Sequence, residues 1–118
     1  MSGFNRRDET GVPINRRNYY RLRLPMNEFL QVWIEGLIFE ICEIAERSFV
    51  ITDSRVPHRS GVCRGVIQWG DGKQSRFSGR IGPDLDGRRL VMDVEGIQTG
   101  HIVAEQRRLR QRYPDRAE

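Results

Sequence analysis

The sequence predicts a mainly β fold: a small six-stranded antiparallel β-barrel with one C-terminal α-helix and a flexible N-terminal arm. Six short segments carry strand-type apolar patterning, and turn residues separate them at close intervals. Helical spacing of apolar residues appears only near the C-terminus. Short strands joined by tight turns and followed by one helix are typical of a small barrel whose open side the helix covers.

Residues 1–15 are expected to form the flexible arm. They are polar, contain Gly3, Gly11 and Pro13, and show no apolar period. Residues 16–118 are expected to form one domain with a single modest core.

The barrel is expected over residues 28–96, with strands at 28–35, 37–44, 48–52, 62–69, 74–81 and 89–95. Gly36 predicts a hairpin between the first two strands, and Asp71-Gly72 predicts another between the fourth and fifth. Residues 53–61 are expected to form a loop. Gly65 and Gly79 lie inside strands, which predicts the bulges or bends that a small sheet needs in order to close.

The C-terminal helix is predicted over residues 99–113. Thr99 is the expected N-cap, and Pro114 follows the end. The arginines of residues 107–112 are interpreted as a solvated face. The face toward the barrel is expected to hold Ile102, Ala104 or Gln106, Leu109 and Tyr113.

The charge balance favours an anionic partner. The chain has 20 Lys and Arg residues against 16 Asp and Glu residues, a formal net charge of +4. Lys73 is the only lysine; genomic base composition explains such arginine usage equally well, so both interpretations stay open. Cys42 and Cys63 lack metal-ligand spacing, and the sequence shows neither a secretion signal nor an apolar run of membrane-spanning length. A cytoplasmic chain with two reduced thiols is therefore expected.

The segment Arg16-Arg17-Asn18-Tyr19-Tyr20-Arg21 concentrates cationic and aromatic side chains just before the first predicted strand. A guanidinium group is always charged, presents its donors in a flat fork, and stacks on aromatic faces. It can therefore bind a phosphate with two hydrogen bonds and also lie flat against a base. This combination indicates a nucleotide-like anion as the ligand, although Tyr19 and Tyr20 are more often packing residues than stacking platforms.

Within this segment, Arg17-Asn18-Tyr19-Tyr20-Arg21 resembles the RxxxR motif of PilZ domains, bacterial receptors for cyclic di-GMP. The order of six strands and a terminal helix is similar to the PilZ barrel over essentially the whole chain. The resemblance implies that Arg17 and Arg21 contact phosphates and stack on guanine, with Arg16 as an additional basic contact. It also implies that the arm wraps over the barrel when cyclic di-GMP binds.

The second PilZ motif, [D/N]xSxxG, corresponds to residues 43–48, where this sequence departs from the pattern at every defining position. Glu43 keeps a carboxylate able to accept from a guanine edge, one methylene further out. Ala45 has no hydroxyl, although a backbone N–H could still meet a phosphate. Ser48 tolerates a positive φ less well than glycine does.

Two further functions stay open beside a cyclic di-GMP receptor that regulates a downstream protein partner. One is a degenerate PilZ adaptor that binds no nucleotide and works by protein–protein contact. The other is an oligonucleotide-binding barrel, which the concentration of arginines in the arm and helix disfavours. We expect no enzymatic activity, since the sequence has no nucleophile elbow, HExxH pair or glycine-rich phosphate loop. His58 and His101 have no second ligand nearby in sequence, so neither a metal nor a cofactor is expected.

Overall fold

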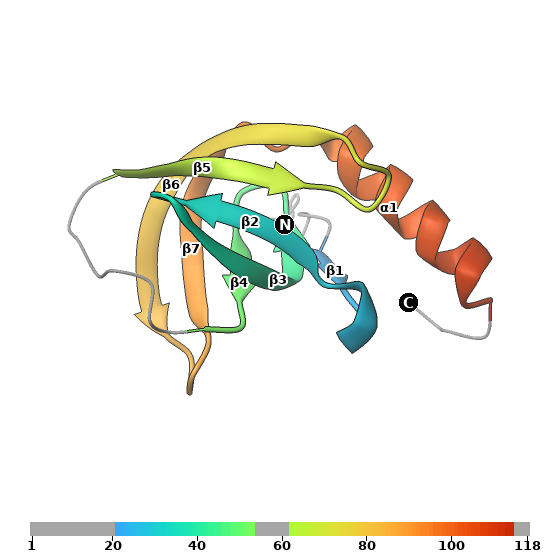
Figure 1. The fold of residues 1–118 in the computed structure, drawn as a ribbon, viewed down its shortest axis with the longest axis horizontal. Coiled ribbons are helices and arrows are strands. Elements are labelled where there is room, and N and C mark those ends of the chain that lie inside the picture. Colours follow the sequence, from blue (N-terminus) through green and yellow to red (C-terminus); the bar gives the residue numbers. More distant parts are fainter. Residues whose placement is uncertain (1–20, 54–61, 115–118) are drawn as a thin grey trace, which may run out of the picture.

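A computed structural model describes residues 21–53 and 62–114, which form a closed antiparallel barrel and one helix (Figure 1). The sheet order is β1-β3-β2-β5-β6-β7-β4, and β4 also pairs with β3, which closes the barrel. The strands are β1 (Arg21–Arg23), β2 (Leu30–Ile34), β3 (Leu37–Ala45), β4 (Phe49–Ile51), β5 (Val62–Gln68), β6 (Gln74–Asp84) and β7 (Arg89–Glu95). A 3-10 helix, η2 (Met26–Glu28), follows β1, and α1 (Thr99–Arg112) ends the fold.

The mainly β fold and its six-stranded barrel are confirmed. Each of the six predicted strands corresponds to one of β2 to β7, and all neighbours in the sheet are antiparallel. The structure adds β1, a short edge strand on β3 that the sequence analysis placed in the segment leading to the barrel. The expected arm and most of the expected loop at 53–61 lie outside the described residues.

The core fills the barrel because alternate residues of each strand point inward. In β2, Leu30, Val32 and Ile34 are buried, whereas Gln31 is exposed and Trp33 is half-buried. At the centre, the rings of Phe49 and Phe77 meet edge to face, with centroids 5.2 Å apart. Other fully buried side chains are those of Leu22, Ile41, Ile44, Ile51, Ile67, Val91, Val94 and Ile102.

Both predicted hairpins are present. Glu35 and Gly36 have φ values of 52° and 85°, the two positive angles that a two-residue hairpin turn requires. In the β5–β6 turn, Gly72 has a φ of 91°, and its N–H donates to the carbonyl of Trp69 at 2.9 Å. These local signals hold because the turn geometry depends on only two or three residues.

The two strand glycines have different roles. Gly79 lies opposite a register shift of the β6–β7 pair, and the extra residue of this irregularity is on β7, between Met92 and Glu95. Gly65 keeps an unbroken register with both neighbouring strands. A Cβ atom at Gly65 would lie in steric conflict with the carbonyl oxygen of Trp33, so glycine is needed here for close backbone approach.

α1 lies against the end of the barrel formed by the β5–β6 turn and η2 (Figure 1). The predicted N-cap is wrong by one residue: Gln98 is the N-cap, and the hydroxyl of Thr99 donates to the carboxylate of Glu46. Ile102 and Leu109 are buried as expected; of the alternatives Ala104 and Gln106, Gln106 is half-buried and Ala104 is exposed, and Tyr113 is half-buried against the core. The buried position beside Ala104 belongs to Glu105, a charged residue that the apolar pattern did not predict.

Candidate functional site

The candidate site begins with β1, which fixes the last arginine of the RxxxR segment. The sequence Arg21-Leu22-Arg23-Leu24 alternates charged and apolar residues, so Leu22 and Leu24 enter the core and both arginines stay outside. Pairing with β3 places Arg21 opposite Ala45, and it places Arg23 opposite Glu43. Arg21, the last residue of the RxxxR segment, therefore lies beside the second motif segment, although more than twenty residues separate it from Ala45.

Arg21 and Glu43 form a direct ion pair. The Nη1 of Arg21 donates to Oε2 of Glu43 at 2.7 Å. The arginine side chain is 53% exposed and the glutamate side chain is 17% exposed. An exposed pair of this kind stabilises by only about 0.2–1 kcal/mol. The carboxylate can therefore be separated from the guanidinium at little cost.

The turn between β3 and β4 holds the other two predicted site residues. The N–H of Ala45 donates to the carbonyl of Ser48 at 2.8 Å and closes this turn. In this structure the turn itself therefore uses the Ala45 N–H donor. Ser48 is not among the described non-glycine residues with positive φ, so the turn does not need the glycine of the family motif.

A groove of about 500 Å³ borders the same turn. Glu46 and Arg47 form one wall, and residues 94–99, from the end of β7 to the start of α1, form the rest. The N–H of Val94 donates to the carbonyl of Arg47 at 2.9 Å, so β7 holds the turn in place. The turn therefore contacts β1 on one side and borders the groove on the other.

Four of the six predicted site residues are brought together: Arg21, Glu43, Ala45 and Ser48. Arg16 and Arg17, the other two, lie outside the described residues. Within residues 21–53 and 62–114, no group of three or more His, Cys, Asp or Glu side chains is arranged to hold a metal ion. No helix in the same part of the chain is long and apolar enough to cross a membrane.

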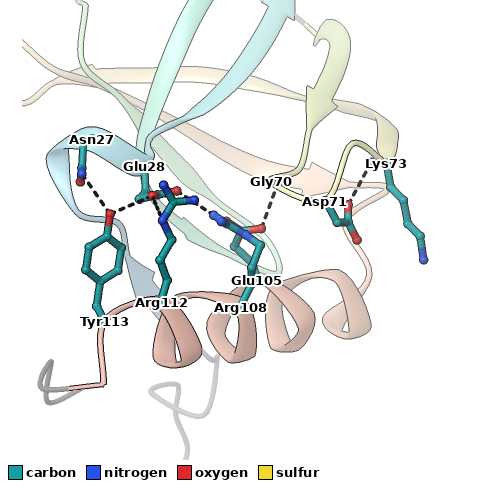
Figure 2. Close-up of polar contacts among 9 residues, drawn as sticks. All are labelled: Asn27, Glu28, Gly70, Asp71, Lys73, Glu105, Arg108, Arg112 and Tyr113. Atoms are coloured by element: carbon teal, nitrogen blue, oxygen red, sulfur yellow. Dashed lines mark hydrogen bonds and ion pairs between the residues drawn. The ribbon is translucent and has the colours of Figure 1, made fainter.

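A second polar cluster was not predicted from the sequence. Arg108 on α1 donates through Nη2 to Glu28 of η2 at 2.9 Å and to Glu105 of its own helix at 2.6 Å (Figure 2). Glu105 is 2% exposed, and it also accepts from the N–H of Gly70 at 3.0 Å. Arg108 and Glu105 together therefore join α1, η2 and the β5–β6 turn.

Glu28 is the centre of this cluster on the barrel side. Its Oε2 accepts from the hydroxyl of Tyr113 at 2.9 Å and lies 3.2 Å from the Nε of Arg112. Hydrogen bonding from Arg108, with a further contribution from Tyr113, holds the pKa of Glu28 below its usual value despite its burial. We call Glu28, Glu105, Arg108, Arg112 and Tyr113 the helix clamp (Figure 2).

The sequence contained a partial signal for the helix clamp. Glu105 and Arg108 are three residues apart, a spacing that places both side chains on one helix face. The arginine run of α1 was interpreted as solvated, and Arg107 and Arg110 are exposed as expected. Arg108 differs because the buried carboxylate of Glu105 and the carboxylate of Glu28 both face it.

Comparison with known proteins supports the fold assignment. No family model matches the sequence, and no curated protein matches it. The structure is similar to that of the Bacillus subtilis inhibitor of motility, MotI/DgrA, with a TM-score of 0.58 and 19% sequence identity. The match covers 87% of this chain and 54% of the MotI/DgrA chain. The fold is PilZ-like. This chain spans about half of the MotI/DgrA structure. Because the sequence identity is only 19%, this similarity describes the fold alone.

Proposed function

We propose that this chain is a non-enzymatic cyclic di-GMP receptor or adaptor domain of bacterial second-messenger signalling, and that Arg21 binds a phosphate of the ligand. One observation carries the proposal: the β1–β3 register places Arg21 of the RxxxR segment opposite Ala45 of the second motif. The PilZ-like fold and the formal net charge of +4 support it.

The chemistry of the Arg21–Glu43 pair suits an exchange of partners. Cyclic di-GMP carries two phosphates, which accept hydrogen bonds, and two guanine edges, which donate them. When a phosphate takes the guanidinium donors of Arg21, the carboxylate of Glu43 is released and can accept from a guanine edge. Arg16 and Arg17 precede β1 in the chain, and we propose that they supply the remaining cationic contacts.

The proposal includes regulation of a downstream protein partner. Ligand contacts made by Arg17 and Arg21 would reposition the segment before β1 and present a different surface to a downstream protein. A ligand can shift the equilibrium between two arrangements of this segment only if it binds one arrangement more tightly. The exchange of partners at Arg21 provides such a preference.

Calorimetric titration with cyclic di-GMP tests the proposal. We expect binding by the parent protein and its loss in Arg17→Ala and Arg21→Ala. Arg88→Ala is the matched control, because Arg88 is an exposed arginine in the β6–β7 turn, away from β1. Parent binding that persists in both site variants would contradict the assignment of these arginines.

A degenerate adaptor is the second candidate, and the β3–β4 turn favours it. Ala45 has no hydroxyl, and its N–H is used within the turn. A folded parent protein that gives no heat with cyclic di-GMP would support this adaptor function. A parallel titration with a short single-stranded oligonucleotide separates both functions from nucleic-acid binding.

A further inference from the structure

The outer face of the barrel carries an apolar row across three neighbouring strands. Trp33 of β2 lies opposite Ile38 of β3 on one side and opposite Val66 of β5 on the other. Val32 and Ile34 are buried, so the intervening Trp33 side chain lies on the outer face. Ile38 is 58% exposed, and Trp33 and Val66 are half-buried. We call Ile38, Trp33 and Val66 the outer row.

Two opposite charges lie at diagonal positions around Trp33. Glu40 is two residues beyond Ile38 on β3, and Arg64 is two residues before Val66 on β5. β3 and β5 are both antiparallel to β2, so they run in the same direction. Glu40 lies two residues further along β3 and Arg64 lies two residues earlier on β5, so they lie at opposite corners of the outer row. Glu40 and Arg64 are exposed, and neither forms an ion pair within the described part of the chain.

We propose that this face binds a second copy of the chain through a two-fold symmetric contact centred on Trp33. Consider a two-fold axis that lies in the interface and is perpendicular to the line from Glu40 to Arg64. It brings Glu40 opposite the second copy's Arg64 and, by symmetry, Arg64 opposite the second copy's Glu40. Trp33 lies near the axis and faces its own counterpart.

The composition of the face agrees with an interface between copies. A central aromatic residue with apolar neighbours and a charged rim is the arrangement found at binding hot spots. In a symmetric pair, two corner charges of the same sign would repel their counterparts, whereas opposite charges form two attractive contacts across the interface. Arg76, which lies opposite Val66 on β6, adds a further exposed cation to the rim beside β5. The face is therefore complementary to itself.

The oligomeric state of the full chain tests this proposal directly. We expect sedimentation equilibrium to show a concentration-dependent species of twice the 13.8 kDa chain mass. Ile38→Glu should weaken the dimer by at least about tenfold, since it places a charge in the apolar centre. Met26→Glu is the control: Met26 is 85% exposed but belongs to η2, so its substitution should leave the dimer unchanged.

A charge exchange separates this two-fold contact from any other association. Glu40→Arg and Arg64→Glu alone each place like charges together at two points and should each weaken the dimer by at least about tenfold. The double variant restores both attractions and should return the dissociation constant to within about threefold of the parent value. Circular dichroism checks that every variant is folded. A parent protein that is monomeric at all concentrations, a dimer that survives Ile38→Glu, or a double variant that stays monomeric would overturn the proposal.

Discussion

At the scale of single residues, Arg21 is paired with Glu43 through a weak, exposed ion pair. Its guanidinium is half-exposed while Leu22 anchors the next position of β1 in the core. The β1 backbone therefore fixes the position of the Arg21 Cα atom, and the weak ion pair with Glu43 orients the guanidinium. This arrangement preorganises a cation without removing it from solvent.

Glu43→Ala is expected to weaken cyclic di-GMP binding, although it frees Arg21. Releasing the exposed ion pair favours binding by about 0.2–1 kcal/mol. Losing a hydrogen bond from guanine to a carboxylate costs about 1.5–3 kcal/mol, which is the larger effect. The net loss is about 3- to 100-fold in affinity, measured by calorimetry. Asp86→Asn, which removes an acid in the β6–β7 turn, is the control and should bind as the parent does. Tighter binding by Glu43→Ala would mean that Glu43 only competes with the ligand.

Glu28 is expected to make stability depend on pH. Its pKa in the folded protein is lowered from 4.5 by Arg108. Its stabilising contribution is therefore complete above pH 4.5 and disappears as the pH falls through the lower folded-state value. Urea unfolding of the parent and of Glu28→Gln, followed from pH 7 to about pH 3, should give a difference in stability that narrows below pH 4.5. A difference that stays constant over this range would contradict the prediction.

At the scale of elements, the sequence predicted what depends on neighbouring residues and missed what depends on distant ones. The strands β2 to β7 follow from alternation and from hairpin turns, which are local. β1 was missed because three residues form a strand only when an edge, here that of β3, is available to pair with them. Glu105 was missed for a similar reason: its burial depends on Gly70 and Arg108, and only Arg108 is near it in sequence.

The candidate site shows the same division. The motif resemblance selected Arg21 and the 43–48 segment, and the structure brings them together. The family pattern did not reveal that the turn itself uses the Ala45 N–H, because a backbone hydrogen bond depends on the shape of the turn rather than on side-chain identity.

Two glycine substitutions should have opposite effects on stability. Alanine at Gly65 would place Cβ in steric conflict with the carbonyl oxygen of Trp33 and close to the Phe77 ring, so β2 and β5 would have to separate. We expect Gly65→Ala to destabilise by more than about 3 kcal/mol. Gly100 lies in α1 with no atom near its added Cβ, and Gly100→Ala should stabilise by about 0.5–1 kcal/mol. Urea unfolding measures both, and a tolerated Gly65→Ala would show that the two strands are not held this closely.

At the scale of the whole molecule, the interactions that hold the barrel strands together differ from those that attach α1 to the barrel. The barrel strands share a continuous apolar core and a closed set of backbone hydrogen bonds. The helix contributes Ile102 and Leu109 to that core, and much of its remaining attachment is polar, through the helix clamp. Because Glu28 lies a few residues after β1, the helix clamp also places the end of α1 beside the segment that leads from Arg21 into the barrel.

Amide hydrogen exchange should therefore separate α1 from the barrel when the helix clamp is broken. Arg108→Met leaves Glu105 buried with no cationic partner, and breaking a buried pair typically costs about 3–5 kcal/mol. Because this cost falls on the docked helix, local opening becomes easier there before the barrel unfolds. We expect exchange at least about tenfold faster over residues 102–112 and little change in β2, β5 and β6. Arg110→Met, a change at an exposed position of the same helix, should leave the pattern unaltered. If exchange instead rose equally in the strands and the helix, α1 and the barrel would be one cooperative unit, and the helix clamp would stabilise the whole fold rather than the docking of α1.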